Sequence, residues 1–359
     1  MHPGKAKLIL LSFFLFKMNW LLKNLLKFTG TQKFLSVQLD ITNACNLKCI
    51  HCYRPDTTER DLPFSDWLKI LDQYAALADK LALKPCIALC GGEATISPLF
   101  SPLLRELRHR WPEAPLTLIT NGTALSPDAV SAIKSCGVAV QISMDGPDEG
   151  RNDIIRGQGA FSKMMASVSI LKSVGIDPAF QAVLSLRTSS WIPEFFKTAA
   201  RLQADSMSFT RFVPQGRGAR LAAEQADRPL TKLELRDAYV KIVECSRAAG
   251  IPTSTNLPLF VLVDSSLGAH GKAGFQGLVV DHRGNLKLTS RADFRLGSVL
   301  GEGLENLFLN HPVMNDLRAG HIEGCGTCGF YDRCGGDRNA AFVEYGSFLK
   351  RDPGCWLRT

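Results

Sequence analysis

Residues 36–52 read SVQLDITNACNLKCIHC, a short β-rich run that leads directly into three closely spaced cysteines. From Ser36 to about Phe212, similar runs alternate with stretches of helical periodicity. The β-rich runs are residues 36–42, 86–92, 115–121, 138–146, 179–186 and 206–212. Repeated β–α units in this order predict an α/β fold with a parallel sheet, open or curled into part of a barrel.

The helical stretches and the ends of the β-rich runs carry two further signals. Residues 66–82 and 101–110 are helical in pattern, and Ser126 followed by Pro127 is typical of a helix start. Active sites of parallel α/β folds lie at the carboxyl ends of the strands. The polar or reactive residues found at such ends are Cys45–Cys52, Gly91-Gly92-Glu93, Asn121-Gly122, and Ser143 with Asp145.

The composition is that of a globular protein. The 359 residues are 45% hydrophobic and 21% charged, which excludes general disorder. The formal net charge is +8, but no dense run of Lys or Arg indicates a nucleic-acid interface. The excess positive charge fits an acidic small molecule or an acidic protein partner instead.

The chain has 11 cysteines, and most of them fall into two tight groups. The groups are Cys45, Cys49 and Cys52, and then Cys325, Cys328, Cys334 and Cys355. Short gaps favour a metal centre over disulfides, because neighbouring thiolates can converge on one ion or cluster. Such centres need reduced thiols, so the sequence predicts a cytoplasmic protein. Small buried side chains are predicted for the remaining Cys86, Cys90, Cys136 and Cys245.

The first group, C-x3-C-x2-C, suits a 4Fe–4S cluster. Three thiolates on one loop can hold three irons of such a cluster and leave the fourth iron open. Chance would place this spacing somewhere in the chain at roughly the 1% level. A zinc site that includes His51 is the less favoured alternative, because structural zinc sites use four ligands.

This motif resembles that of the radical S-adenosylmethionine (SAM) superfamily. The resemblance extends over about residues 36–355 and implies a partial (β/α)6 barrel, similar to part of a TIM barrel, with a small C-terminal α+β iron–sulfur domain. It implies that Cys45, Cys49 and Cys52 hold the catalytic cluster, whose open iron chelates the amino and carboxylate groups of SAM. The reduced cluster then cleaves SAM to methionine and a 5′-deoxyadenosyl radical, which abstracts hydrogen from the substrate.

The same resemblance implies further contacts to SAM. Gly91-Gly92-Glu93 matches a motif that binds the SAM amino group, where glycines allow close backbone approach and a carboxylate accepts from an ammonium. Asn121 and Ser143 match residues that contact the ribose and methionine parts, and Arg156 matches an arginine that contacts the carboxylate. Loop capping or a surface ion pair is the alternative for these three. Residues 212–218, FVPQGRG, resemble the family segment that closes the sixth β–α unit.

The second cysteine group resembles the SPASM extension of radical SAM enzymes. This resemblance implies one auxiliary 4Fe–4S cluster. Its ligands would be Cys325, Cys328, Cys334 and Cys355. The full SPASM pattern has seven cysteines and two clusters, whereas here Arg338 stands at one ligand position and no cysteine lies between Cys245 and Cys325. A zinc ribbon at the same four positions is the alternative.

We therefore expect four segments along the chain. They are an N-terminal amphipathic extension (1–35), a radical SAM partial barrel (36–219), a helical linker region (220–276) and a SPASM/twitch-like auxiliary cluster domain (277–359). Within the last segment, residues 277–289 predict a β-hairpin and residues 301–319 a helical region.

The N-terminal extension is apolar and basic. Residues 8–16 are too few to span a bilayer, and residues 18–28 predict an amphipathic helix. We expect that helix to pack on its own domain rather than on a membrane surface or a partner protein. Translation from Met18 would remove residues 1–17 altogether.

The substrate class rests on resemblance. Enzymes with SPASM-type extensions often modify ribosomal peptides by crosslinking or epimerisation, which is our first hypothesis. The CGGD segment at 334–337 and the DPGC ending at 352–355 also resemble enzymes that modify tetrapyrrole side chains in haem d1 and alternative haem synthesis, our second hypothesis. The third is a non-catalytic iron–sulfur or zinc scaffold, in which the Gly91-Gly92-Glu93 motif would be idle.

The implied cofactors determine the expected partners. Reduction of the SAM-binding cluster needs an electron donor such as flavodoxin or ferredoxin. Only 44 residues precede Cys45, too few for a fused peptide-recognition domain. A peptide substrate would therefore bind directly or through a separate recognition protein.

Overall fold

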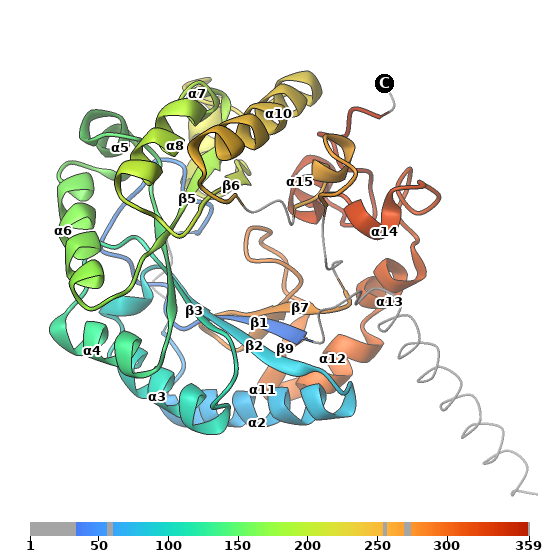
Figure 1. The fold of residues 1–359 in the computed structure, drawn as a ribbon. Coiled ribbons are helices and arrows are strands. Elements are labelled where there is room, and N and C mark those ends of the chain that lie inside the picture. The colour runs from blue at the N-terminus through green and yellow to red at the C-terminus, as the bar shows by residue number, and fades with distance from the viewer. Residues whose placement is uncertain (1–33, 56–59, 254–256, 269–273, 358–359) are drawn as a thin grey trace, which may run out of the picture.

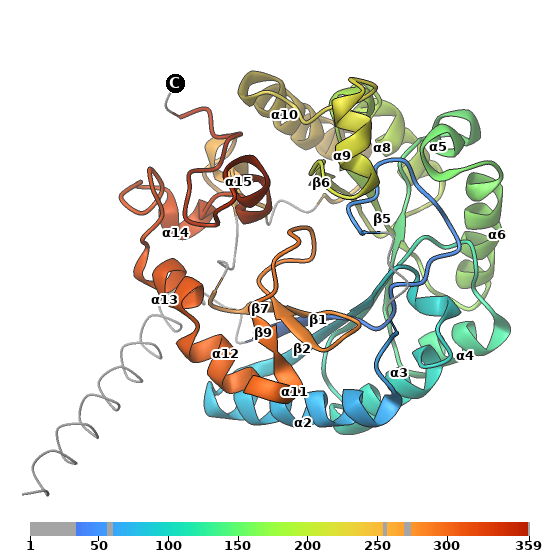
Figure 2. The same ribbon diagram turned by 180° about the vertical axis from the view of Figure 1, so that it is seen from behind.

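The structure is a computed structural model that describes residues 34–55, 60–253, 257–268 and 274–357. The amphipathic helix expected at 18–28 lies outside these residues. Across the described ranges, one curved sheet is surrounded by helices on its outer side (Figure 1), and the view from behind shows the same arrangement (Figure 2). No helix in these ranges is long and apolar enough to cross a membrane.

The described part of the chain forms a single nine-stranded sheet in the order β6-β5-β4-β3-β2-β1-β7-β8-β9. The strands are β1 Phe34–Asp40, β2 Lys84–Cys90, β3 Leu116–Thr120, β4 Ala139–Ser143, β5 Ala179–Leu184, β6 Met207–Arg211, β7 Gly277–Val280, β8 Asn285–Lys287 and β9 Gly297–Ser298. Neighbours from β6 to β7 are parallel, and β8 and β9 are antiparallel. Since β6 and β9 are the two free edges, the sheet is an open, partial barrel, as the sequence predicts.

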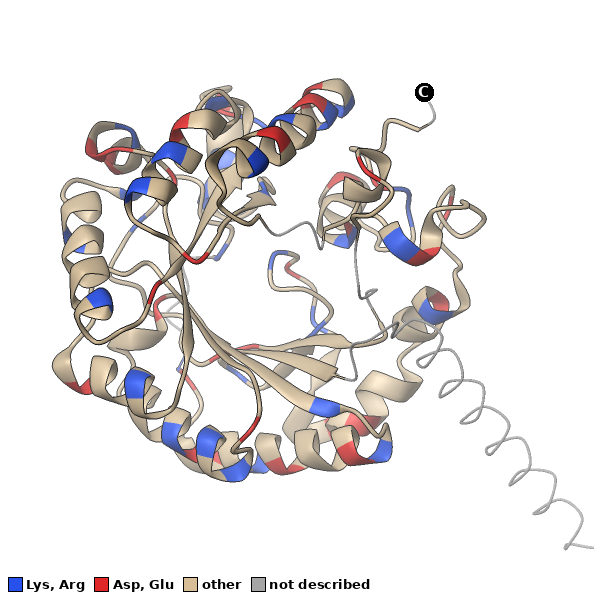
Figure 3. Ribbon diagram, viewed as in Figure 1, with Lys and Arg blue, Asp and Glu red and all other residues tan. Residues whose placement is uncertain are grey.

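Helices follow the strands and bury the outer face of the sheet. They are α2 Phe64–Lys80, α3 Phe100–Arg110, α4 Pro127–Ser135, α5 Glu149–Arg156, α6 Ala160–Ser173, α7 Leu186–Ser189, α8 Ile192–Arg201, α9 Arg217–Ala223 and α10 Lys232–Ala249. Alternate strand residues such as Leu35, Val37 and Leu39 of β1 are buried, as expected for strands packed under helices. Lys and Arg are interspersed with Asp and Glu on the outer surfaces of these helices (Figure 3).

Two local structures that the sequence predicts, a helix start and a β-hairpin, are present. The Ser126 hydroxyl accepts a hydrogen bond from the Ala129 N–H at 3.1 Å, and Pro127 is the first residue of α4. The hairpin expected at 277–289 is confirmed by the antiparallel pairing of β7 with β8. Its first strand also pairs in parallel with β1, so the hairpin extends the barrel sheet.

The C-terminal part is mostly helical and contacts the barrel. It contains α11 Val299–Glu302, α12 Leu304–Asn310, α13 Pro312–Ala319, α14 Tyr331–Cys334 and α15 Arg338–Tyr345. The start of α12 is tied to α2, because the Leu304 N–H donates to Gln73 at 2.7 Å and Lys80 pairs with Glu305 at 2.5 Å. The region that carries the second cysteine group is thereby packed beside the partial barrel (Figure 1).

The core around β1 gives a test of the fold. Leu39 has no exposed surface and lies between Leu89 of β2 and Val280 of β7. We expect Leu39→Ala to lower the free energy of unfolding by about 2–5 kcal/mol, because it leaves a cavity in the centre of the sheet. Leu233→Ala, at a side chain that is 59% exposed, is the control and should change it by less than about 0.5 kcal/mol. Urea unfolding curves decide, and equal losses in both variants would contradict the assigned core.

Candidate active site and second cysteine site

A cavity of about 800 Å³ lies at the carboxyl ends of β1 to β6. The loops that follow these strands line it, as the strand-end rule for parallel sheets predicts. Among its lining residues are all the expected SAM-site residues: Cys45, Cys49, Cys52, Gly91, Gly92, Glu93, Asn121, Ser143 and Arg156. The structure therefore brings together nine residues that the sequence spreads over more than 100 positions.

The loop that carries Cys45, Cys49 and Cys52, called the cysteine loop below, follows β1 directly. Cys49 is buried, Cys52 is partly buried and Cys45 is exposed, and none of the 11 cysteines forms a disulfide. Burial raises the pKa of the Cys49 thiol to about 11, and burial also raises that of Cys45. Such thiols lose their protons when they bind a metal as thiolates, so metal binding is coupled to proton release.

The donor set of this loop fits an iron–sulfur cluster. It offers three soft sulfur ligands that line the same cavity, and His51 uses its Nε2 to pair with Asp145 at 2.7 Å. No three His, Cys, Asp or Glu side chains within the described ranges converge on a single ion position.

Two glycines set the distance between the cysteine loop and β2. The Gly92 and Glu93 N–H groups donate to the carbonyls of Thr42 and Ala44, both at 2.8 Å. A Cβ atom at Gly92 would lie 2.2 Å from the Ala44 oxygen, so only glycine allows this approach. The motif thus fixes the backbone that precedes Cys45.

The FVPQGRG segment supports the same loop from the other side. The Gly218 N–H donates to the Cys52 carbonyl at 3.2 Å, and Arg217 Nε donates to the Cys49 carbonyl at 2.9 Å. Gly216 has a φ of 54°, and a Cβ atom there would lie 2.7 Å from the Cys52 oxygen. Its two glycines are therefore explained by close packing on the cysteine loop.

Glu93 is almost fully buried, and its carboxylate joins β2 to β3. Its Oε1 accepts hydrogen bonds from the hydroxyls of Thr95 and Thr120, each at 2.7 Å, and its Oε2 accepts from the Asn121 N–H at 2.7 Å. The Asn121 side chain in turn donates to Asn46 of the cysteine loop at 2.9 Å. Glu93 and Asn121 are thus held rigidly beside the three cysteines.

Arg156 takes part in a buried network. Its Nη2 lies 2.6 Å from Asp145 Oδ2, the same oxygen that His51 contacts, and the Val183 N–H donates to Oδ1 at 2.7 Å. Burial opposes the charge on Asp145, but Arg156 and His51 outweigh it and hold the pKa of that carboxyl well below its usual range. The alternative of a surface ion pair for Arg156 is wrong, since only 9% of its side chain is exposed.

The second cysteine group lines one small cavity of its own. All four expected ligands are present there: Cys325, Cys328, Cys334 and Cys355. The Leu259 N–H donates to Cys334 Sγ at 3.3 Å, and Arg351 donates to Cys355 Sγ at 3.5 Å. Asp337, three residues after Cys334, caps α15 by accepting hydrogen bonds from the N–H groups of Asn339 and Ala340.

The scattered cysteines lie apart from the second cavity. Cys90, directly before Gly91, lines the large cavity, and burial raises its pKa to about 12. Cys136 is buried as predicted, whereas Cys86 and Cys245 are only partly buried.

The glycine contacts give a second test. We expect Gly92→Ala to lower the free energy of unfolding by about 1–3 kcal/mol, because the new methyl group would force the loop at Ala44 to move. Gly277→Ala is the matched control, since a Cβ atom there meets nothing within 4 Å. Urea unfolding of both variants in the metal-free form measures the difference. Equal stability of the two variants would show that the close approach at Gly92 is not a constraint.

Comparison with known proteins agrees with this geometry. The Radical SAM superfamily matches residues 39–188. The AdoMet-dependent heme synthase of Methanosarcina barkeri is 26% identical over 345 residues, which cover 89% of this chain and 95% of that protein. The mycofactocin maturase MftC of Mycobacterium tuberculosis is 28% identical over 335 residues, covering 88% and 81%.

Solved structures show the same fold. SuiB of Streptococcus suis bound to the precursor peptide SuiA superposes with a TM-score of 0.71 at 18% identity, covering 90% of this chain and 76% of SuiB. anSMEcpe with bound AdoMet and the Cp18Cys peptide gives 0.69 at 19% identity, covering 89% and 93%. Together with the cavity, the cysteine loop and the open sheet, the family match identifies residues 39–188 as a radical SAM domain, whose superfamily uses a 4Fe–4S cluster and SAM.

Proposed function

We propose that Cys45, Cys49 and Cys52 hold the 4Fe–4S cluster that binds SAM. The observation that carries this proposal is their shared cavity with Glu93, Asn121, Ser143 and Arg156. When bound, the cluster and SAM supply the 5′-deoxyadenosyl radical that removes a hydrogen atom from the substrate. The chain itself has to bind both molecules, orient them and exclude water.

The described contacts support distinct tasks for the protein side chains. Glu93 offers a fixed carboxylate to the SAM ammonium, because its hydrogen bonds to Thr95 and Thr120 hold it in place. Asn121 is held against the cysteine loop, where its amide can contact SAM. Arg156 is oriented by Asp145, so that its remaining N–H donors are available for the SAM carboxylate. Asp145 acts through Arg156 and is a positioning residue.

We further propose one auxiliary 4Fe–4S cluster in the second cysteine site. Four thiols around one cavity match its ligand number, and no other cysteine of the described residues lines that cavity. Hydrogen bonds from Leu259 and Arg351 to the sulfurs would raise its reduction potential and suit it to accept an electron. The proposed domain boundary at residue 277 separates this site from the barrel in sequence, although β7 belongs to the same sheet.

A ribosomal peptide is the substrate class that we favour. Relatives of similar length include a mycofactocin maturase, and the structural relatives SuiB and anSMEcpe are complexes with peptides. A tetrapyrrole is the second candidate, because relatives include AdoMet-dependent heme synthase and the pre-heme d1 synthase of Dinoroseobacter shibae, 27% identical over 89% of this chain. A precursor-peptide gene or a haem pathway beside the gene would distinguish them. We further propose that the enzyme is cytoplasmic and that a flavodoxin or ferredoxin donates electrons to it. If the substrate is a peptide, a separate recognition protein would help to bind it.

SAM cleavage tests the catalytic proposal. Anaerobically reconstituted, dithionite-reduced protein should form 5′-deoxyadenosine and methionine even without substrate, as measured by chromatography. Glu93→Gln should slow this at least about tenfold, since it loses a charge-assisted bond to the ammonium. Glu224→Gln, at an exposed side chain, is the matched control and should match the wild type. Cluster-loaded wild-type protein that forms no 5′-deoxyadenosine would refute the proposal.

Iron content tests the two ligand sets separately. We expect about eight irons per chain in the wild type and about four after Cys45, Cys49 and Cys52 are changed together to Ala. Cys355→Ala should lose the auxiliary cluster and substrate turnover while SAM still binds at the first site. Cys86 lines neither cavity, so Cys86→Ala is the control and should keep all the iron. Stoichiometric zinc without labile sulfide, or an unchanged paramagnetic spectrum for Cys355→Ala, would contradict the ligand assignment.

A further inference from the structure

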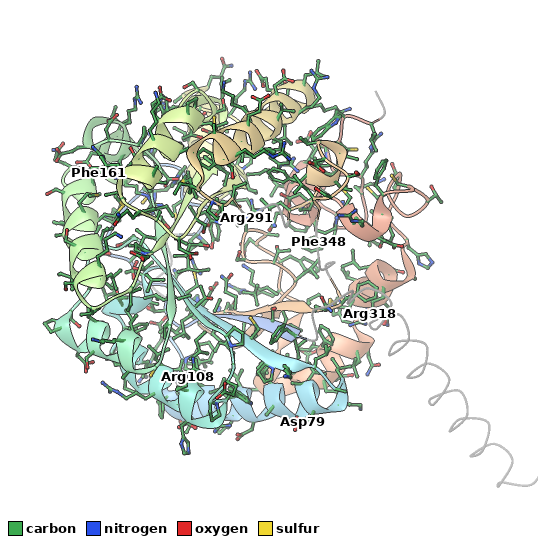
Figure 4. All side chains as sticks on the ribbon, viewed as in Figure 1. Asp79, Arg108, Phe161, Arg291, Arg318 and Phe348 are labelled. Carbon is green, nitrogen blue, oxygen red and sulfur yellow. The ribbon has the colours of Figure 1, made fainter. Side chains whose placement is uncertain are left out.

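The loop between β8 and β9, residues 288–296, spans the gap between the two edges of the open sheet. Arg291 in this loop donates from Nη1 to the carbonyl of Arg211 on β6 at 2.6 Å, and the Asp293 N–H donates to Gln215 at 3.1 Å. Figure 4 shows Arg291 in the central space between the sheet and the C-terminal segment. Arg291 and Arg211 both line the large cavity.

Arg211 is held by an acid of the second cysteine region. Asp352, three residues before Cys355, accepts two hydrogen bonds from Arg211 Nη1 at 2.9 Å and one from the Asp337 N–H at 2.8 Å. A Cβ atom at Gly354 would lie 2.5 Å from Arg211 Nη2, so a larger residue in the DPGC ending would displace the Arg211 guanidinium. Arg211 is thereby committed to the C-terminal segment.

Arg291 is held less closely by carboxylates than three other arginines that line the cavity. Arg54, Arg156 and Arg211 each pair with a carboxylate within 2.9 Å, whereas Arg291 Nη2 lies 3.6 Å from Asp337. The other oxygen of Asp337 is used to cap α15. Within the described residues, Arg291 therefore makes a single hydrogen bond, and its Nε and Nη2 have no hydrogen-bond acceptor.

Asp337, which pairs with Arg291 at 3.6 Å, does not line the large cavity. Glu93 is the only acidic residue among the described lining residues, and the proposed function assigns it to the SAM ammonium. The side chain of Arg291 is 16% exposed, so an anion beside it would be largely shielded from water. Nε and Nη2 together form the fork that binds a carboxylate by two parallel hydrogen bonds.

We propose that Arg291 binds a carboxylate of the substrate and so determines which substrates enter the cavity. This rests on the proposed function of the cavity. The SAM carboxylate is assigned to the wall near Arg156, whereas Arg291 lies against β6 at the sheet edge. The carboxylate can come from a peptide terminus or from a tetrapyrrole propionate, since both present the same group. Neutral Ser290 and Gln181 on the same cavity offer further hydrogen bonds.

Equilibrium binding to cluster-loaded full-length protein tests this subsite without turnover. One pair of probes is mesoporphyrin IX and its diamide, followed by absorbance. The other is dansyl-labelled tetra-alanine with a free C-terminal carboxylate and the same peptide as its amide, followed by fluorescence. We expect the wild type to bind the acid of at least one pair at least about tenfold more tightly than its neutral partner. The pair that shows this preference identifies the source of the carboxylate.

Variants of Arg291 assign the preference to this side chain. Arg291→Gln should abolish it, and Arg291→Lys should keep part of it, because lysine retains the charge but not the fork. Arg236→Gln, at an exposed ion pair on α10, is the control and should keep it fully. Equal binding of acid and neutral probes, no binding of either acid, or a preference that survives Arg291→Gln would overturn the proposal. Because wild-type SAM cleavage is measured separately, its failure would refute the proposed function and not this subsite.

Discussion

The close contact between the loop after β1 and the loop after β2 determines the geometry of the whole site. Two backbone hydrogen bonds join Gly92 and Glu93 to Thr42 and Ala44, and the lack of a side chain at Gly92 permits them. Because Glu93 follows immediately, the same contact fixes its carboxylate against β3. The cysteine loop, Glu93 and Asn121 therefore form one rigid assembly.

Buried charge is the second constraint on this fold. Asp145, Glu93 and Asp352 have at most 2% of their surface exposed, and each is surrounded by donors. An isolated carboxylate in such a place would be strongly unfavourable, so the partners from other strands are required for folding as well as for binding. Asp145 joins β4 and β5 to the cysteine loop through His51, and Asp352 joins the second cysteine site to β6 through Arg211. The two cysteine sites are thus connected to the same barrel by ionic contacts.

The sequence predicts what local chemistry determines. Alternating apolar residues locate the first six strands, Ser126 and Pro127 locate a helix start, and cysteine spacing locates both thiol groups. It does not predict pairings between distant residues, such as His51 with Asp145 or Arg211 with Asp352, which are 94 and 141 positions apart. Each partner alone has the ordinary pattern of a turn or surface residue, and only the folded sheet brings them together. The sequence does not predict the parallel pairing of β7 with β1 for the same reason.

The pairing of β7 with β1 affects how the protein folds. Strand β1, which leads into the cysteine loop, is flanked by β2 on one side and by Gly277–Val280 of β7 on the other. During folding it remains an edge strand until this distant segment docks, and contacts of long sequence separation form slowly. In that interval its open backbone groups are a template for intermolecular pairing, and its neighbouring thiols are accessible to oxidants. The time at which β7 docks therefore sets how long the nascent protein is exposed to aggregation and oxidative damage.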